Sequence, residues 1–570
     1  MNSKQRFCAR LILACIILIA GSLVLALYSI QIIDGKSYVA KADRQYIKSA
    51  NSVFDRGSIF FSTKDGTYPA AATLTSEYLI YMNPKLIKDP VGTYQALSQY
   101  IKLDQEQFMR KAALVNDPYE ELARKVGESI VQSISALSLR GIGILKESKR
   151  SYPGNQLAAH ALGIIGENNS LVEGRYGLER TYEDVLARTG VGGSANIFAQ
   201  LFSSIGGSVS GGKSGGRGDI VTTIEPTAQG YLENVLAKTS TEWKPDEIGG
   251  IIMDPQTGNI VAMAALPSFD PNDTSKVKDP AVFSNSLVEN AYEMGSIMKP
   301  LTIAAGFDSQ AITSSFTYDD TGTITLSGKK ISNFDGKARG VIPVQEILSQ
   351  SLNVGVATVA LKVGKDDFSK YFLSFGLGSK TGIDQPNETS GLASNLKTGR
   401  DIEIATMAYG QGIAVSPMAM TRALSILANN GKLVTPHIVQ EIDYLDGTKK
   451  KINPDLGTSV LEKQTVEDVT GMLVKVVDTA LRKGALKMEH YSIAAKTGTA
   501  QIPDPVTKGY YPDRYLHSFF GYFPAYNPKF IIFLYQKYPK GARYASETLV
   551  NPFNDLTKFL IDYYNVPPDR

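Results

Sequence analysis

The sequence predicts an α+β protein that has one membrane-spanning helix at its N-terminus and folded domains outside the cytoplasm. Three observations predict this architecture. Residues 11–33 form a long apolar run, apolar hairpin patterns stand near both ends of residues 219–570, and longer helical patterns lie between those hairpins. A sheet that joins strands from both ends of a domain, with helices inserted between them, is typical of α+β folds.

The apolar run at 11–33 carries no charged side chain and consists mainly of Leu, Ile, Val and Ala. About twenty such residues span the hydrocarbon core of a bilayer. Basic residues precede the run and Asp34 follows it, so the positive-inside rule places residues 1–10 in the cytoplasm. A cleaved signal peptide is the alternative, but the run is longer than the apolar region of a signal peptide. We therefore predict a single-pass anchor in the cytoplasmic membrane, with the chain after Asp34 outside the cytoplasm.

The rest of the chain divides into two units around a glycine-rich segment. Residues 34–189 mix short apolar runs with charged stretches, and we expect a helix at 118–133. Residues 190–218 contain ten glycines and many serines, which predicts a flexible linker or a long surface loop. Residues 219–570 form the second predicted unit. Its strands are expected at 251–253, 260–263, 519–523 and 530–535, and its helices at 344–362, 417–429 and 554–564.

Composition excludes several classes of function. There are 59 Lys and Arg against 56 Asp and Glu, a net charge of +3, which argues against a dedicated nucleic-acid binder. The two cysteines, Cys8 and Cys15, lie in the first fifteen residues, so the remaining chain has no disulfide and no cysteine-based metal or redox site. The four histidines fit no metal-binding spacing. We expect no metal, no cofactor and no nucleic-acid partner.

Two short motifs in the glycine-rich segment are rejected. Residues 207–214 match the P-loop pattern, and residues 212–216 match the nucleophile-elbow pattern. Both mechanisms need a strand before the loop and a helix after it, so that backbone N–H groups converge on an anion. The glycines that follow at 215–218 do not begin a helix.

A serine three residues before a lysine is a candidate nucleophile, because one helical turn brings the amine beside the hydroxyl. The pattern occurs at Ser210, Ser275, Ser296, Ser327 and Ser394. Only Ser296 is followed by an apolar stretch, in which a buried Lys299 would have a lowered pKa. On this segment alone, a helix N-cap with a surface lysine is an equally good interpretation.

Two further motifs could complete such a site. Ser351 and Asn353 lie in the predicted helix 344–362, where a hydroxyl and a carboxamide could relay a proton and hold a substrate amide. In isolation, a polar pair between helices is the simpler interpretation. Lys-Thr-Gly occurs at Lys380, Lys397 and Lys496, but only Lys496 follows a strand-like run. The segment formed by Lys496, Thr497, Gly498 and Thr499 could bind a carboxylate at a strand edge.

Together, the motifs at Ser296, Ser351 and Lys496 follow the order found in penicillin-recognising serine acyltransferases. The chain resembles a class B penicillin-binding protein over most of its length. Further segments that carry the resemblance begin at Arg56, Arg150, His160, Gly177, Asp254, Gly376, Thr381, Gly410 and Phe519. After Arg56-Gly57 the chain lacks the Asp-Arg pair of the family, and its 190–218 insert is longer than expected.

The resemblance implies a membrane-anchored peptidoglycan D,D-transpeptidase. It implies an elongated pedestal domain at 34–189 and a penicillin-binding transpeptidase domain at 219–570, built on an antiparallel sheet flanked by helices. Ser296 would attack the D-Ala-D-Ala carbonyl of a stem peptide, with Lys299 as base and Ser351 as proton relay. Asn353 would hold the substrate amide. The terminal carboxylate would be bound by Lys496 and by the hydroxyls of Thr497 and Thr499, with the compact Gly498 between them. The N–H groups of Ser296 and Thr499 would form the oxyanion hole.

Other functions built on the same residues were considered. A β-lactamase needs a glutamate-activated water, and no Glu-x-x-x-Asn spacing lies between Asn353 and Lys496. A D,D-carboxypeptidase would use water as the acceptor, and a non-catalytic penicillin-binding scaffold would use no acceptor at all. Within the family we favour a septal division enzyme over an elongation enzyme. The implied partners are peptidoglycan stem peptides, β-lactams as inhibitors, the membrane, a membrane glycosyltransferase and division-complex proteins.

Overall fold

The structure is a computed structural model that describes residues 55–168, 171–188, 216–453 and 457–570. The predicted cytoplasmic tail 1–10, the predicted anchor 11–33 and most of the predicted linker 190–218 lie outside the described residues. No helix in the described part of the chain is long and apolar enough to cross a membrane. The described residues form two compact units, one of residues 76–149 and a larger one of residues 56–75 with 150–570. The domain boundaries expected from the sequence stay predictions.

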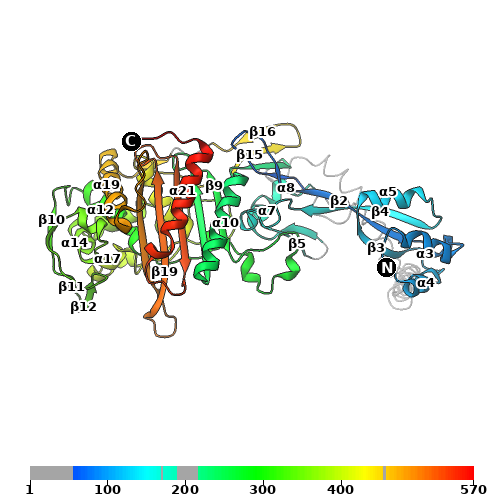
Figure 1. Cartoon of the computed structure of the whole chain (residues 1–570), viewed down its shortest axis with the longest axis horizontal. Coiled ribbons are helices and arrows are strands. Elements are labelled where there is room, and N and C mark those ends of the chain that lie inside the picture. Colours follow the sequence, from blue (N-terminus) through cyan, green and yellow to red (C-terminus); the bar gives the residue numbers. More distant parts are fainter. Residues whose placement is uncertain (1–54, 169–170, 189–215, 454–456) are drawn as a thin grey trace, which may run out of the picture. The chain divides into compact units, whose positions relative to one another are not determined.

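The smaller unit is a three-stranded layer covered by helices (Figure 1). Strand β3 (Glu120–Val126) pairs with the second half of β2 (Ala70–Met82), and β4 (Ile142–Ser151) also pairs with β2. Helices α3 (Pro90–Ser98), α4 (Gln105–Ala112) and α5 (Glu128–Ala136) supply the rest of the unit. Its core gathers Ile80, Met82, Leu97, Phe108, Val126, Val131 and Ile134.

The helix predicted at 118–133 is wrong over its first half. Glu120–Val126 is the strand β3, and helix α5 begins only at Glu128. The charged sequence of β3 favours a helix by local propensity, but its pairing with Tyr78–Met82 of β2 supplies backbone hydrogen bonds and buries Val126.

The larger unit contains two main sheets. One places β16 (Lys449–Lys451), β15 (Val439–Tyr444), β7 (Gly218–Thr222), β1 (Ile59–Phe60) and the start of β2 side by side. Strand β1 pairs with β7 in parallel, and Ile59 and Ile220 face each other in the core. Short elements accompany this sheet: α6 (Ala159–Leu162), β5 (Ile165–Asn168), β6 (Leu171–Gly174), α7 (Gly177–Thr181) and α8 (Glu183–Leu186).

Buried charges join the segments near β1. Arg56 Nε lies 2.6 Å from Glu179 Oε2, and Arg150 Nε lies 2.7 Å from Glu179 Oε1. Glu183 binds Arg56 Nη2 at 2.6 Å, and the Tyr152 hydroxyl donates to Glu179 at 3.2 Å. We call Arg56, Arg150, Tyr152, Glu179 and Glu183 the junction cluster. Because it joins residues more than a hundred positions apart, it fixes the start of the larger unit onto residues 150–183.

The second sheet is antiparallel, with the order β18 (Ala494–Pro503), β19 (Tyr510–Phe523), β20 (Phe530–Lys537), β8 (Glu247–Met253) and β9 (Ile260–Leu266). Strand β20 pairs with β8, so that Phe533 lies opposite Ile251. The two hairpins predicted at the ends of the domain therefore join in one sheet, as the α+β prediction requires.

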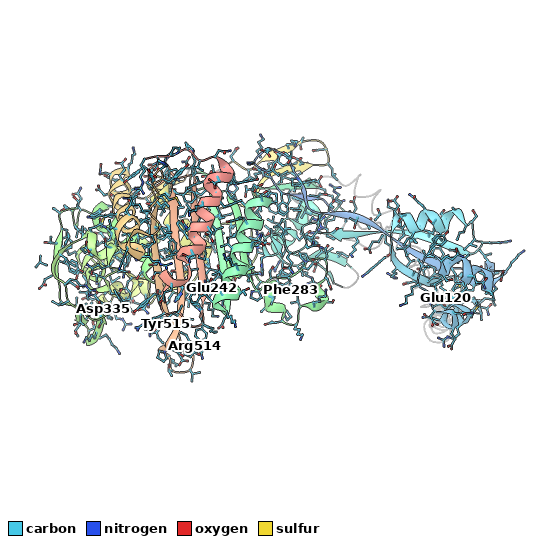
Figure 2. The ribbon with its side chains drawn as sticks, in the orientation of Figure 1. Glu120, Glu242, Phe283, Asp335, Arg514 and Tyr515 are labelled. Carbon is cyan, nitrogen blue, oxygen red and sulfur yellow. The ribbon has the colours of Figure 1, made fainter. Side chains whose placement is uncertain are left out.

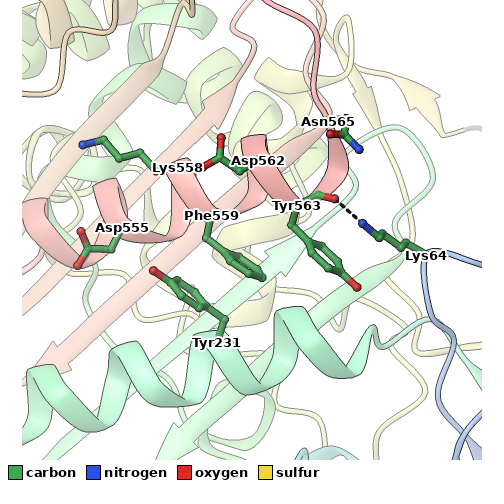
Figure 3. A pocket seen from close by; sticks show the side chains of 8 residues that line it. All are labelled: Lys64, Tyr231, Asp555, Lys558, Phe559, Asp562, Tyr563 and Asn565. Carbon is green, nitrogen blue, oxygen red and sulfur yellow. Dashed lines mark hydrogen bonds between the residues drawn. The ribbon is translucent and has the colours of Figure 1, made fainter.

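Helices α10 (Pro226–Trp243) and α21 (Val550–Tyr564) cover this sheet (Figure 1). They are held together by stacked rings, as Figure 3 shows. The rings of Tyr231 and Phe559 are 3.9 Å apart at 7°, and Phe559 stacks in turn on Tyr563 at 5.3 Å. Lys64 caps the stack, with its Nζ 4.1 Å from the centre of the Tyr563 ring. The C-terminal helix is thus fixed to the domain by ring contacts as well as by its buried apolar face.

A group of helices packs against strands β18 and β20 of the second sheet. The helices of this group also pack against one another. It contains α11 (Ser286–Glu289), α12 (Lys299–Asp308), α13 (Gln345–Ser349), α14 (Asn353–Val363), α15 (Lys365–Ser374), α16 (Asn395–Thr398), α17 (Asp401–Met407), α18 (Pro417–Ser425) and α19 (Lys463–Lys475). Small ladders complete the unit: β10 (Thr317–Asp320) with β13 (Gly340–Pro343), β11 (Thr323–Leu326) with β12 (Lys329–Ser332), and β14 (Lys432–Leu433) with β17 (Thr458–Ser459).

The helix predicted at 344–362 is interrupted. Helix α13 ends at Ser349 and α14 begins at Asn353, because Ser351 adopts a left-handed backbone with φ of 56°. A non-glycine residue rarely takes this conformation. The helices predicted at 417–429 and 554–564 are confirmed as α18, which continues into the short 3-10 helix η6 (Ile426–Ala428), and α21.

Candidate active site

Ser296 lies in the 3-10 helix η5 (Gly295–Met298), which leads directly into α12 at Lys299. Pro300 stands in the first turn of α12, where its missing N–H costs least. Gly295, with φ of 65°, passes close to β18: a Cβ atom there would lie 2.9 Å from the carbonyl oxygen of Thr499. Because residue 295 is a glycine, its backbone can lie close to β18. This close contact places Ser296 against the Lys-Thr-Gly strand.

Lys299 is completely buried and points to the interruption between α13 and α14. Its Nζ lies 2.5 Å from the carbonyl oxygen of Ser351 and 3.1 Å from the Ser351 hydroxyl. Burial, with a smaller contribution from the charge of Lys496, lowers the pKa of the Lys299 amine well below its ordinary value. A neutral amine in this position can accept a proton.

Ser351 and Asn353 are positioned by the end of one helix and the start of the next. The left-handed backbone of Ser351 separates the two helices, and Asn353 is the first residue of α14. Asn353 Nδ2 donates a 3.0 Å hydrogen bond to the carbonyl oxygen of Ser332, which ties the helix to β12. The sequence prediction of one continuous helical turn carrying both groups is wrong, yet both side chains line the same cleft.

Lys496 comes from the edge strand β18, opposite Phe520 of β19. Its Nζ lies 3.1 Å from the Ser351 hydroxyl, so that both lysines meet at this one oxygen. Burial lowers the pKa of the Lys496 ammonium to about 8. At neutral pH the Lys496 group therefore keeps most of its charge, while burial and the nearby Lys496 charge shift the Lys299 amine toward its neutral form.

The rest of the strand is shaped by close contacts. A Cβ atom on Gly498 would lie 2.3 Å from Ser518 Oγ and 2.6 Å from the carbonyl oxygen of Met294, so a larger residue would displace the segment before Ser296. The Thr499 hydroxyl accepts a 3.1 Å hydrogen bond from the N–H of Ala545.

These residues border a cleft of about 740 Å³. Its lining includes Ser296, Ser351, Asn353, Lys496, Thr497 and Thr499 from the sequence prediction. Lys299 and Gly498 lie behind this surface, where they contact Ser351 and Ser518 respectively. All eight predicted residues are therefore brought together from three separate segments of the chain.

The motifs that the sequence analysis rejected lie elsewhere. Ser275, Ser327 and Ser394 do not line the cleft, and neither do Lys380 and Lys397. Ser210 lies outside the described residues.

Sequence reasoning missed several residues around the site. Ser518 donates a 2.7 Å hydrogen bond to the carbonyl oxygen of Met294 and so supports the segment before Ser296. Glu293 Oε1 accepts from the N–H of Gly412 at 2.8 Å and from the Tyr510 hydroxyl at 3.1 Å, which links the loop at Gly412 and the start of β19 to the same segment. A carboxylate three positions before Ser296 was a visible signal, whereas Ser518 gave none, because only the sheet register brings it close.

Comparison with known proteins agrees with this geometry. Residues 248–558 match the model of the penicillin-binding protein transpeptidase domain, and residues 55–197 match that of the penicillin-binding protein dimerisation domain. This chain belongs to the class B penicillin-binding proteins. The transpeptidase match contains every residue of the predicted site, from Ser296 to Thr499.

Relatives of this class B protein match nearly its full length. Stage V sporulation protein D of Bacillus subtilis is 28% identical over 533 residues, 92% of this chain and 80% of that protein. The peptidoglycan D,D-transpeptidase FtsI of Escherichia coli K12 is 24% identical over 566 residues, 98% of this chain and 92% of that protein. The crystal structure of penicillin-binding protein 2X from Streptococcus thermophilus has a TM-score of 0.75 at 19% identity, covering 90% of this chain and 80% of that one, which shows the shared fold.

Proposed function

We propose that this class B penicillin-binding protein is a peptidoglycan D,D-transpeptidase that cross-links stem peptides through an acyl-enzyme on Ser296. One observation carries the proposal: in a cleft lined by Ser296, a buried lysine with a strongly lowered pKa and a second, charged lysine both bind the hydroxyl of Ser351. A base, a proton relay and a carboxylate-binding cation are thus present beside one nucleophile.

In the first half-reaction, Ser296 Oγ attacks the carbonyl carbon between the two terminal D-alanines. Its proton passes to the neutral Nζ of Lys299. The N–H groups of Ser296 and Thr499 would stabilise the tetrahedral oxyanion, and each such donor is worth about 3–4 kcal/mol in other enzymes. When the C–N bond breaks, the departing nitrogen takes a proton from the Ser351 hydroxyl, which is replaced from Lys299.

In the second half-reaction, the amine of another stem peptide attacks the ester carbon of the acyl-enzyme. The amine loses a proton to the same relay, the bond to Ser296 Oγ breaks, and Ser296 regains its proton. Asn353 would hold the peptide amide of the donor. Lys496, with the hydroxyls of Thr497 and Thr499, would bind the terminal carboxylate while it is still attached.

We further propose that residues 11–33 anchor the protein in the cytoplasmic membrane and that the catalytic unit works outside the cytoplasm, in septal wall synthesis. The near full-length likeness to FtsI of E. coli supports this placement. A membrane glycosyltransferase and division-complex proteins are the expected partners. Fluorescent fusions of the full chain should gather at division sites, and an even distribution along the lateral wall would favour the elongation alternative.

The test of the chemistry is the intact mass of the full-length protein in detergent after incubation with benzylpenicillin. We expect one stable penicillin adduct on the wild type and none on Ser296→Ala. Ser327→Ala, which removes a serine of the same spacing outside the cleft, is the matched control and should keep the adduct. An adduct that persists on Ser296→Ala would identify another nucleophile, and rapid loss of the adduct by hydrolysis would indicate a β-lactamase.

A further inference from the structure

The charged residues that line the catalytic cleft all have the same sign. They are Lys330, Arg339, Arg482, Lys496 and Arg543, and no Asp or Glu is among the described residues that line it. The whole chain carries a net charge of only +3, so this concentration of cations is local. A cleft lined by one sign of charge attracts and retains ligands of the opposite sign.

Two of these cations already have a partner or a role. Arg339 forms an ion pair with Asp335 at 2.8 Å and donates a 3.1 Å hydrogen bond to Gln350. Lys496 is assigned to the terminal carboxylate of the substrate. Figure 2 labels Asp335, the ion-pair partner of Arg339, and Tyr515, which is one of the residues that line the cleft.

The other three cations form no ion pair with the described residues, and the Arg543 guanidinium lies 5.4 Å from the centre of the Tyr544 ring. Within the described part of the chain, no carboxylate lies within ion-pair distance of Lys330, Arg482 or Arg543. All three side chains are exposed, and Arg482 makes only a 3.2 Å hydrogen bond to the Asn551 side chain. The terminal carboxylate of the substrate is assigned to Lys496. It leaves the positive charges of Lys330, Arg482 and Arg543 without a ligand.

Arg543 is the best placed of the three, because its backbone is held firmly beside the carboxylate-binding strand. Its carbonyl oxygen lies 3.1 Å from His517 Nε2, and its N–H donates to Glu547 Oε2 at 3.0 Å. Two residues later, the N–H of Ala545 binds the Thr499 hydroxyl. Glu547 is occupied by the backbone N–H groups of Arg543 and Tyr544. The guanidinium therefore projects from a fixed backbone into the cleft that Thr499 also lines.

Aromatic side chains line the cleft next to Arg543. The ring of Phe334 meets that of Tyr544 edge to face, with centroids 6.2 Å apart, and both residues line the cleft. Phe334 follows β12 and Tyr544 precedes α20 (Ala545–Thr548), so the contact joins its two sides. Both rings are exposed, by 53% for Phe334 and 36% for Tyr544, so they are accessible to a ligand that binds beside Arg543.

We propose that this cleft selects stem peptides that carry a second free carboxylate besides the terminal one, and that Arg543 binds it. The inference rests on the proposed function and names the substrate class of the same site. Guanidinium groups bind carboxylates in a bidentate manner, which gives both affinity and orientation. Two groups of a stem peptide have this chemistry: the α-carboxylate of an isoglutamyl residue and the carboxylate of a diamino acid.

The experiment compares synthetic D-Ala-D-Ala pentapeptide donors with full-length protein in detergent. One donor has both internal carboxylates free, two have one or the other replaced by a carboxamide, and the fourth has both replaced. The measurement is kcat/KM for release of D-alanine. We expect the fully amidated donor to be about fivefold poorer than the free acid, and the singly amidated donors to identify which carboxylate is bound.

Arg543→Gln should bring the ratio between free and fully amidated donors close to one. Lys329→Gln removes an exposed lysine of the same strand as Lys330 that does not line the cleft, and it should keep the wild-type ratio. Equal use of all four donors by the wild type, with the penicillin adduct on Ser296 intact, would overturn the selectivity but not the transpeptidase assignment. Absence of the penicillin adduct would overturn the proposed function and this inference with it.

Discussion

The larger unit contains two clusters of deeply buried charge, and they differ in how the charge is compensated. In the junction cluster, both arginines bind Glu179, Arg56 at 2.6 Å and Arg150 at 2.7 Å. In the catalytic cleft, no carboxylate of the described chain lies within ion-pair distance of Lys299 or Lys496, and both amines bind oxygens of Ser351.

The difference decides what each cluster can do. Burial alone would lower the pKa of the Arg56 guanidinium, but the adjacent carboxylates of Glu179 and Glu183 raise it above its ordinary value, so the charge is kept. For Lys299, burial acts without a compensating anion and a second lysine adds repulsion, so the pKa is lowered. A buried cation with a partner holds segments together, whereas a buried lysine without one becomes a base.

The largest effect on acylation is expected when Lys299 is replaced. Lys299→Met should slow acylation by benzylpenicillin about 10³-fold, because a positioned general base contributes about 10²–10⁴. The thermal midpoint should not fall, since an apolar side chain replaces a buried amine. Acylation followed by mass spectrometry and unfolding followed by circular dichroism measure the two quantities. The control is Lys397→Met, which replaces an exposed lysine of a rejected Lys-Thr-Gly motif and should keep the wild-type rate. If Lys299→Met itself were acylated within tenfold of the wild-type rate, the role of Lys299 would be refuted.

Substitution in the junction cluster should reduce stability and leave the rate of acylation unchanged, the reverse of the result expected for Lys299→Met. Glu179→Gln leaves two buried guanidinium groups without their shared carboxylate and should lower the free energy of unfolding by about 3–5 kcal/mol. The protein that remains folded should still be acylated at the wild-type rate. Chemical denaturation with a parallel penicillin assay tests both points. Glu173→Gln, which breaks a half-exposed pair with Arg175, should change the free energy of unfolding by less than about 1 kcal/mol. If Glu179→Gln and Glu173→Gln lowered the free energy of unfolding equally, burial of the ion pair would not explain the contribution of Glu179 to stability.

The pKa of Lys496 predicts a high-pH limit of activity. Because burial lowers this pKa to about 8, the ammonium loses its proton as the pH rises through 8 rather than near the ordinary lysine value. Acylation by a carboxylate-bearing β-lactam should therefore decline above pH 8, by up to about tenfold per pH unit. Lys496→Arg stays charged, so its rate profile should lack this decline. A wild-type rate that is constant from pH 7 to 9.5 would contradict the assignment.

The smallest effect is expected at Glu293. Its Oε1 links the loop at Gly412 to the start of β19, while its buried Oε2 has no hydrogen-bond partner in the described chain. Burial raises the pKa of this carboxyl, so the neutral form is favoured relative to an exposed glutamate. Glu293→Gln keeps an acceptor oxygen and should change the free energy of unfolding by less than about 1 kcal/mol. Acylation should stay within about threefold of wild type. A loss as large as that of Lys299→Met would place Glu293 in the proton-transfer path.

Local sequence patterns predicted much of the fold. The hairpins at 251–263 and 519–535 are visible because strands alternate with turn residues, and α18 and α21 because their apolar residues recur at helical spacing. Two predictions failed where long-range contacts outweighed local propensity. Strand β3 has a helix-forming sequence but pairs with β2, and the stretch 344–362 has continuous helical periodicity but breaks at Ser351.

The sequence by itself determined the chemistry available to this protein: three short motifs, spread over 200 residues, that hold a serine with its lysine, a serine with its asparagine, and a lysine-threonine-glycine strand. Only the tertiary structure decided that both lysines meet at one hydroxyl and that Lys299 is fully buried. It also decided that three cations without an ion pair in the described chain line the cleft beside them. The physical reason is that burial and charge pairing depend on contacts between distant segments. Local pattern shows which groups a chain carries, whereas the protonation state of each group depends on what the fold places next to it.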